Sequence, residues 1–159
     1  MKDVNILSIM IFLPLIAALI LSFFNTKNEK NLFNFGLLTC LINFVISAKL
    51  FLDFDKSVTG FQYKEVVQIL NNMSFKYYLG IDGIAISLII LTTFLTPICL
   101  MISYNNIKHR VKEFVICFLL IQGFVIGSFC AIDLLLFYIF FEAMLIPMFL
   151  VIGIWGGKD

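Results

Sequence analysis

Leu134–Trp155 reads LLLFYIFFEAMLIPMFLVIGIW, an apolar run in which Glu142 is the one charged side chain. An α-helix rises about 1.5 Å per residue, so this run makes a helix of roughly 33 Å, long enough to cross the hydrocarbon core of a bilayer. A carboxylate near the middle of such a helix costs several kcal/mol unless it is neutral, paired or hydrated. Such residues usually face a bundle interior and handle ions or protons, and the alternative is an acid that only packs against a neighbouring helix.

The composition of the whole chain is that of an integral membrane protein. Of its 159 residues, 62% are hydrophobic and 13% are charged, whereas soluble domains carry roughly 25% charged residues. The net charge of +1 provides no basic surface, so we expect no nucleic acid as a partner. The four cysteines all fall in apolar runs without a CxxC spacing, and there is a single histidine, so no zinc, haem or iron–sulfur ligand set can be assembled.

Apolar runs predict five transmembrane helices, at about residues 6–24, 32–54, 83–104, 113–132 and 134–155. The first run is longer than a signal-peptide core and lacks a small-residue cleavage site, so we expect it to be retained. The predicted fold class is all-α, a polytopic transmembrane helix bundle that forms a single membrane domain over residues 1–159. An odd number of crossings places the two termini on opposite sides of the membrane.

Residues 55–80 are the one long polar segment, and we expect them to form an extramembrane loop. Residues 61–64 (FQYK) alternate in polarity and residues 74–79 are rich in aromatics, which favours a small β-hairpin. Asp82 and Asp133 each stand directly before an apolar run. Their carboxylates are therefore expected to accept hydrogen bonds from the first free amides of two helices.

Two prolines and one glutamine lie in the interiors of other expected helices. Pro14 lies inside the first, and Pro97 in the third leaves the carbonyl of Thr93 without its usual helical donor, so we expect a kink there. Gln122 stands near the middle of the fourth. It is a candidate for a hydrogen bond to another helix or to water, and simple helix packing explains it equally well.

Glu142 has two neighbours that suit a proton-handling site. Tyr138 lies one turn earlier on the same helical face. Pro147 frees the carbonyl of Ala143, where a water molecule can hydrogen-bond inside a membrane. An acid, a local helix break and a hydroxyl together indicate a water-connected proton site, and a cation on a neighbouring helix would favour the charged form of the acid. No such cation lies deep in a span of this chain, so the site is incomplete.

Residues 140–149 (FFEAMLIPMF), followed by residues 152–157 (IGIWGG), resemble the fifth helix of one family of antiporter-like membrane subunits. This family comprises subunit M of bacterial proton-pumping NADH–quinone oxidoreductase and chain 4 of mitochondrial respiratory complex I. The motif LGIDGI at residues 79–84 and KEF at residues 112–114 are similar too. The resemblance extends over essentially the whole chain and is most specific around Glu142.

The resemblance implies a subunit in the membrane arm of a respiratory enzyme, which translocates protons driven by quinone reduction at a distance. NADH, flavin, iron–sulfur clusters and quinone belong to the rest of that complex, so no cofactor or metal is expected in this chain. The glutamate of the family's fifth helix maps onto Glu142, which implies proton transfer by Glu142, paired in the family with a lysine on helix seven. The implied partners are the other membrane-arm subunits and the lipids of a bacterial or mitochondrial inner membrane.

The sequence departs from the family in its length. Family subunits continue well beyond a fifth helix, whereas this sequence stops at Asp159, so the helix-seven lysine and the later lysine-lined half-channel are absent. We interpret the chain as the N-terminal piece of a split subunit, a truncated product or a fragment, whose missing helices could come from a second chain. Alone, it is not expected to pump protons.

Two other functions remain as alternatives. A subunit of a multi-subunit cation/proton antiporter would share the helix-five glutamate, so Glu142 does not separate the two transporters. The residues at 152–157 favour the respiratory enzyme. The third reading is a small structural membrane protein in which Glu142 is a packing acid.

Overall fold

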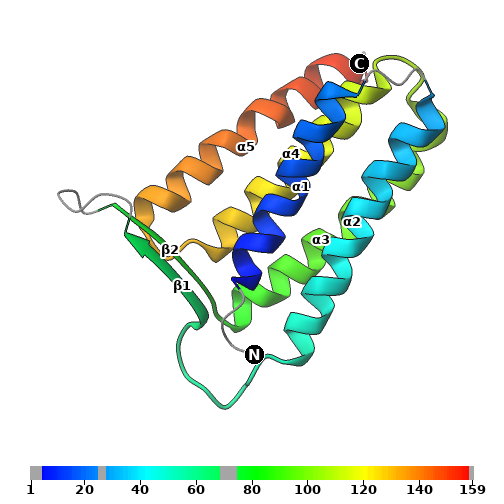
Figure 1. Ribbon diagram of the computed structural model, residues 1–159. Coiled ribbons are helices and arrows are strands. Elements are labelled where there is room, and N and C mark those ends of the chain that lie inside the picture. Colours follow the sequence, from blue (N-terminus) through cyan, green and yellow to red (C-terminus); the bar gives the residue numbers. More distant parts are fainter. Residues whose placement is uncertain (1–4, 25–27, 69–74, 158–159) are drawn as a thin grey trace.

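The computed structural model of the chain describes residues 5–24, 28–68 and 75–157. Within these residues lie five helices and one two-stranded hairpin: α1 (Ile6–Phe23), α2 (Glu29–Leu52), β1 (Gln62–Gln68), β2 (Lys76–Ile81), α3 (Gly83–Asn106), α4 (Val111–Cys130) and α5 (Leu134–Trp155). The helices lie side by side in one bundle, and α1 begins at the end of the bundle opposite to the end of α5 (Figure 1). All five helices are long and apolar enough to cross a membrane, so the predicted all-α bundle with five spans is confirmed.

Helix α4 is the centre of the bundle and packs against each of the other helices, whereas α5 packs mainly along α4. Two glycines of α4 permit this close packing. A Cβ atom at Gly123 would lie 2.7 Å from the side chain of Leu15 in α1, and one at Gly127 would lie 2.8 Å from the ring of Phe140 in α5. Small residues at such contacts let helix backbones approach closely in a membrane. Helix α5 is therefore held on one side only and forms an edge of the bundle.

The polar segment between α2 and α3 contains the predicted β-hairpin, which is confirmed. Strands β1 and β2 pair antiparallel, with Glu65 opposite Leu79, and the ladder is irregular between Gln62 and Glu65. Residues 69–74, which join the strands and include part of the predicted polar loop, lie outside the described residues. The hairpin is also joined to the bundle, because the amide of Ile132 donates to the carbonyl of Tyr78 at 2.9 Å.

Two helices begin with the aspartate caps that the sequence predicts. Asp82 accepts a hydrogen bond from the amide of Ala85 at 2.7 Å. Asp133 accepts from the amides of Leu135 at 2.9 Å and Leu136 at 3.2 Å. Both predictions are confirmed. The cap at Asp133 fixes the start of α5 directly after α4, and so makes the two helices an antiparallel pair.

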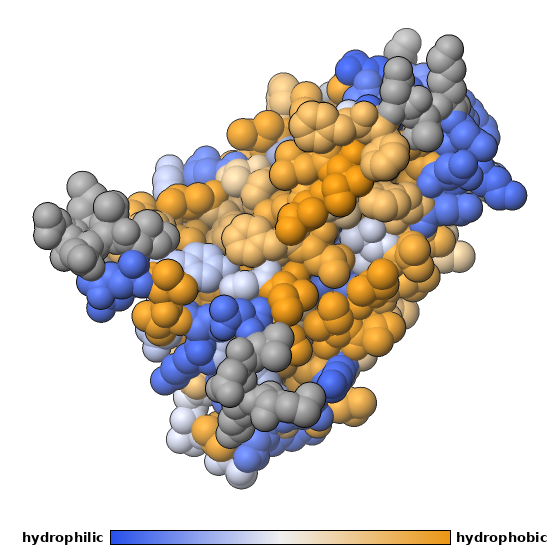
Figure 2. All heavy atoms as spheres, in the orientation of Figure 1, coloured by the Kyte–Doolittle hydropathy of each residue, from blue (hydrophilic) through white to orange (hydrophobic). Residues whose placement is uncertain are grey.

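Polar contacts close the opposite end of the bundle. Lys112 at the start of α4 donates to the carbonyl of Ser22, in the last turn of α1, at 2.7 Å. A cation there also interacts favourably with the negative end of the helix dipole. The indole of Trp155 donates to the carbonyl of His109 at 3.0 Å. Figure 2 shows apolar side chains over the middle of the visible face and hydrophilic ones towards the two ends, as a membrane-crossing bundle requires.

Candidate functional site

Glu142 lies on the exposed side of α5. The buried residues Phe140 and Pro147 mark the side of the helix that packs on the bundle, and Glu142 points away from it. Glu142 therefore does not face the interior of these five helices, and its place in the interior of a larger bundle stays a prediction. The physical reason is the edge position of α5, which has α4 as its main helical neighbour.

Within the part of the chain that the structure describes, no partner lies beside the carboxyl group of Glu142. Among the described residues, Glu142 makes no hydrogen bond and no ion pair. Tyr138, which the sequence places on the same face, is 57% exposed and likewise gives Glu142 no hydrogen bond within the described part of the chain. Tyr138 and Glu142 thus lie one turn apart on α5 and are not hydrogen-bonded to each other.

An open hollow of about 430 Å³ lies beside the acid, lined by Glu142, Ala143, Leu145, Ile146 and Phe149. Ala143 is the residue whose carbonyl lacks a helical donor because Pro147 has no N–H. The acid and the residue with the freed carbonyl therefore line one hollow. Its other walls are apolar side chains, and a carboxyl group left against lipid at this depth is costly. The site needs protein or water to cover it.

Sequence reasoning missed a second carboxyl group, which the chain itself buries. Glu65 of β1 is 8% exposed and accepts hydrogen bonds from the amides of Leu7 at 2.8 Å and Ser8 at 3.1 Å. The hydroxyl of Ser8 also bonds to Glu65, and it lies 2.9 Å from the hydroxyl of Tyr77. Asn5 stands at the N-cap position of α1 but makes no side-chain cap bond. The hairpin therefore caps α1 from a distance, and no local sequence signal pointed to Glu65 as the capping residue.

Sequence reasoning also missed the role of Asn43. This side chain is 0% exposed, and its Nδ2 donates to the carbonyl of Met10 at 3.0 Å. Pro14 follows Met10 by four residues and has no N–H, so the Met10 carbonyl has no helical donor. Asn43 of α2 supplies the missing hydrogen bond to α1. In the sequence, Pro14 indicates that a carbonyl of α1 lacks its helical donor. The sequence could not indicate which side chain supplies the missing hydrogen bond.

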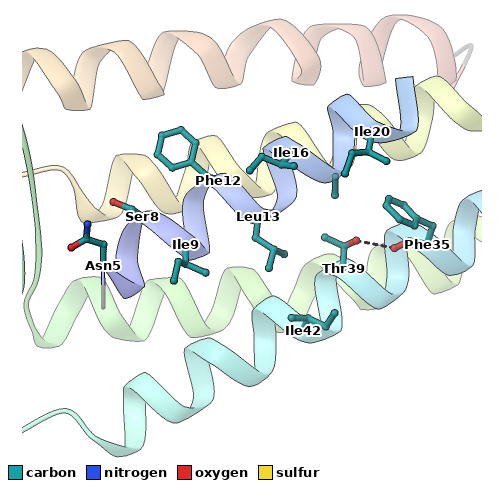
Figure 3. A pocket seen from close by; sticks show the side chains of 11 residues that line it. Asn5, Ser8, Ile9, Phe12, Leu13, Ile16, Ile20, Phe35, Thr39 and Ile42 are labelled. Carbon is teal, nitrogen blue, oxygen red and sulfur yellow. Dashed lines mark hydrogen bonds between the residues drawn. The ribbon is translucent and has the colours of Figure 1, made fainter. Parts of the chain in front are cut away.

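A groove of about 530 Å³ lies between α1 and α2, and Figure 3 shows the side chains that line it. Most of them are apolar, including Ile9, Leu13 and Ile16 of α1. The hydroxyl of Thr39 on the α2 side donates to the carbonyl of Phe35 in its own helix at 2.9 Å. The groove offers an apolar wall and little polar chemistry. In the described residues, no cluster of three or more histidine, cysteine, aspartate or glutamate side chains could hold a metal ion.

Comparison with known proteins identifies the family. The family model described as the amino terminus of NADH-ubiquinone oxidoreductase chain 4 matches residues 6–128. This chain belongs to that family. The resemblance to this family is thereby confirmed.

Relatives of this family match the chain over nearly all its residues. NADH-quinone oxidoreductase subunit M of Rickettsia typhi is 43% identical, over 100% of this chain and 33% of the relative. NADH-ubiquinone oxidoreductase chain 4 of Arabidopsis thaliana is 41% identical, over 96% of this chain and 31% of the relative. The chain thus spans about one third of the length of the relatives that it matches.

The fold is shared with a solved structure. A chain of respiratory complex I from Thermus thermophilus with bound NADH matches with a TM-score of 0.78 and 24% sequence identity. The match covers 96% of this chain and 30% of that chain. At this identity the likeness establishes the fold alone. The five helices long enough to span a membrane and the family together show an integral membrane protein.

Proposed function

We propose that this chain forms the N-terminal part of a membrane-arm subunit of a proton-translocating NADH–quinone oxidoreductase, in which Glu142 transfers protons. The family membership and the names of its relatives support the enzyme. One structural observation carries the role of Glu142. The acid lies in the middle of an apolar helix, on an exposed face, without a partner from the described residues.

Proton transfer by Glu142 requires a cover for the exposed face of α5. An ionisable group in a membrane must be covered by protein, water or an opposite charge, so an element outside the described residues covers Glu142. A cation on that element stabilises the charged form of the acid while it is close, and the acid takes up a proton when the cation moves away. The resemblance implies a lysine in this role. The residue with the freed carbonyl, Ala143, lines the same hollow and can hold water for the transfer.

In the assembly, this chain acts together with other subunits. The redox cofactors and quinone belong to other subunits, and this chain supplies a proton-transferring side chain and no redox group. Its partners are other membrane-arm subunits, helices that complete its own subunit, and the lipids of a bacterial or mitochondrial inner membrane. The family match favours this enzyme over a cation/proton antiporter. A packing acid would require a partner outside the described residues, as a proton-transferring acid does, so the Glu142→Gln variant decides between these two roles.

The test is Glu142→Gln, introduced into the native gene and studied in the assembled enzyme. The amide keeps the size of the side chain but cannot release a proton, so NADH-driven proton uptake should fall while the complex still assembles on native gels. The control is Glu113→Gln, because Glu113 is 47% exposed and makes a surface ion pair to Arg110 at 3.5 Å. Normal pumping by an assembled Glu142→Gln enzyme would overturn the role of Glu142.

A separate measurement tests the enzyme itself. NADH oxidation by membranes that contain the tagged chain should be abolished by a quinone-site inhibitor such as piericidin, and the tagged chain should co-purify with that activity. A chain that purifies in an assembly without inhibitor-sensitive NADH oxidation would support the antiporter instead.

A further inference from the structure

We infer that Asn43 and Gln122 bind a buried water molecule beside the break that Pro14 makes in α1. Asn43 is 0% exposed and uses its Nδ2 on the carbonyl of Met10. Its Oδ1 is buried and has no hydrogen-bond partner among the described residues. One half of this amide is thus satisfied by the broken helix, and the other half is not.

Gln122 in α4 is a second buried amide, and both of its polar atoms are unsatisfied by the described residues. It is 0% exposed, and neither its Nε2 nor its Oε1 has a hydrogen-bond partner within the described part of the chain. Buried polar atoms in native proteins are almost always hydrogen-bonded to protein or to ordered water. Three buried amide atoms without protein partners therefore call for a ligand that both donates and accepts hydrogen bonds.

The helix packing places the two amides at one level of the bundle. A Cβ atom at Gly36 of α2 would lie 2.5 Å from the side chain of Val115 in α4, so these two residues are direct neighbours. Helices α2 and α4 run in the same direction, because both run opposite to α3, which lies between them in the chain (Figure 1). Asn43 and Gln122 each stand seven residues further along, which is about two helical turns. They therefore meet again on the facing sides of the two helices.

Helix α1 reaches the same level from the third side. The carbonyl of Met10 accepts from Asn43, and the next carbonyl, that of Ile11, lies 3.0 Å from the position of a Cβ atom at Gly123. Gly123 is the neighbour of Gln122 in α4. Because Met10 and Ile11 are adjacent, both amides lie beside the turn of α1 that Pro14 interrupts.

Water is the ligand that these atoms fit. A water molecule between the amides accepts a hydrogen bond from Nε2 of Gln122 and donates one to Oδ1 of Asn43. Its second proton is available to the Met10 carbonyl, whose oxygen has a second lone pair, so this water satisfies two of the three amide atoms and Oε1 of Gln122 needs a further donor. Buried waters typically make about three hydrogen bonds to groups that would otherwise be unsatisfied. An ion is disfavoured, because these side chains carry no charge.

The water site continues a polar layer across the bundle. Ser47 stands one turn after Asn43 in α2, and its hydroxyl lies 2.6 Å from the hydroxyl of Thr93 in α3. The layer joins α1 to α4 and is separate from the exposed face of α5 that carries Glu142. The inference therefore does not depend on the proposed role of Glu142.

The deciding experiment is a cryo-EM map of the intact assembly in which buried waters elsewhere in the membrane region are visible. The expected result is density for one water within hydrogen-bonding distance of Asn43 and Gln122. Empty space between the amides, or a direct amide–amide hydrogen bond, would overturn the inference while leaving the proposed function intact. The waters seen elsewhere in the same map are the positive control.

A variant sharpens this test. Gln122→Leu removes two of the three unsatisfied atoms, so a dry site predicts unchanged or higher thermal stability of the assembly. A hydrated site predicts loss of the water density and a lower inactivation temperature, because the water and Asn43 lose a partner. The control is Thr96→Val. Among the described residues, the Thr96 hydroxyl donates only within its own helix, to the carbonyl of Thr92 at 2.7 Å, so both readings should stay unchanged. If Gln122→Leu does not assemble, the map of the parent enzyme decides.

Discussion

The positions of Glu65 and Glu142 in the sequence suggest one environment for each acid, and the structure shows the opposite environment. Glu65 lies in a polar segment outside the apolar spans, yet it is 8% exposed and holds the start of α1. Glu142 lies in the middle of a span, yet it is exposed and has no partner among the described residues. A carboxyl group whose hydrogen bonds are complete acts in stability. One left without partners on an apolar helix depends on what covers it.

The largest effect that this comparison predicts is on activity. Glu142→Gln should lower NADH-driven proton uptake about a hundredfold, the lower end of what a positioned proton-transferring side chain contributes. Quinone reduction coupled to it should fall in parallel, with the amount of assembled enzyme unchanged. Glu142→Asp keeps a titratable group and should retain part of the activity, measured as fluorescence quenching of a pH dye in membrane vesicles. Equal losses in the two variants would point to packing rather than proton transfer.

The next effect is on stability and concerns the other acid. Glu65→Ala leaves the amides of Leu7 and Ser8 without an acceptor and should destabilise the fold by about 3 kcal/mol. The readout is thermal inactivation and protease resistance of the assembled enzyme, with Lys64→Ala at the exposed neighbouring position as control. Glu65→Gln retains one acceptor oxygen and should lose less. A Glu65→Ala enzyme of normal stability that fails to pump would reverse the assignment of the two glutamates.

A third change tests whether the position of Glu142 depends on α4. Gly127→Val would place side-chain atoms where the Phe140 ring lies, since a Cβ atom alone would approach that ring to 2.8 Å. Overpacking of this kind costs about 1–3 kcal/mol and should loosen α5, with no direct effect on the hairpin around Glu65. The measurement is the fraction of the chain recovered in the assembled enzyme. Gly83→Ala, where an added Cβ meets nothing within 4 Å, is the matched control.

The smallest effect concerns Tyr77, which completes the hydrogen bonds around Ser8. Burial raises the pKa of Tyr77 above its usual value, Glu65 adds to the rise, and the hydrogen bond to Ser8 partly opposes it. The folded state thus keeps the phenol proton to a higher pH than the unfolded state. This contribution to stability is complete below about pH 10 and is lost as the pH rises through the raised pKa.

Tyr77→Phe removes the hydroxyl and should cost about 1 kcal/mol at neutral pH. The difference in inactivation temperature between the parent and Tyr77→Phe should therefore shrink as the pH rises above 10, and a difference that grew with pH would contradict this sign. In Tyr77→Phe the hydroxyl of Ser8 still bonds to Glu65, so Glu65 should still cap α1.

Local patterns predicted the elements and failed at the contacts between them. The aspartates at Asp82 and Asp133 were predictable as caps because the amides that they bind follow within three residues. The cap of α1 was not predictable, because Glu65 lies 58 residues from Leu7 and Asn5, the local candidate, makes no cap bond. For Gln122, hydrogen bonding and packing could not be separated by sequence. Gln122 is completely buried and has no partner among the described residues, which together with the position of Asn43 favours a water ligand.

The amino-acid sequence by itself determined the five membrane-crossing helices, the positions of their prolines and the presence of an acid in the last of them. These follow from the length and apolar character of each run and from hydrogen bonds between near neighbours, which act in any tertiary setting. The tertiary structure decided that Glu142 lies on the exposed face of α5 and that Glu65 caps α1. It also decided that Asn43 donates to the carbonyl of Met10, which Pro14 leaves without a helical donor. Those outcomes depend on which helices lie side by side, because a buried polar group is satisfied by whatever the packing of distant segments brings within reach.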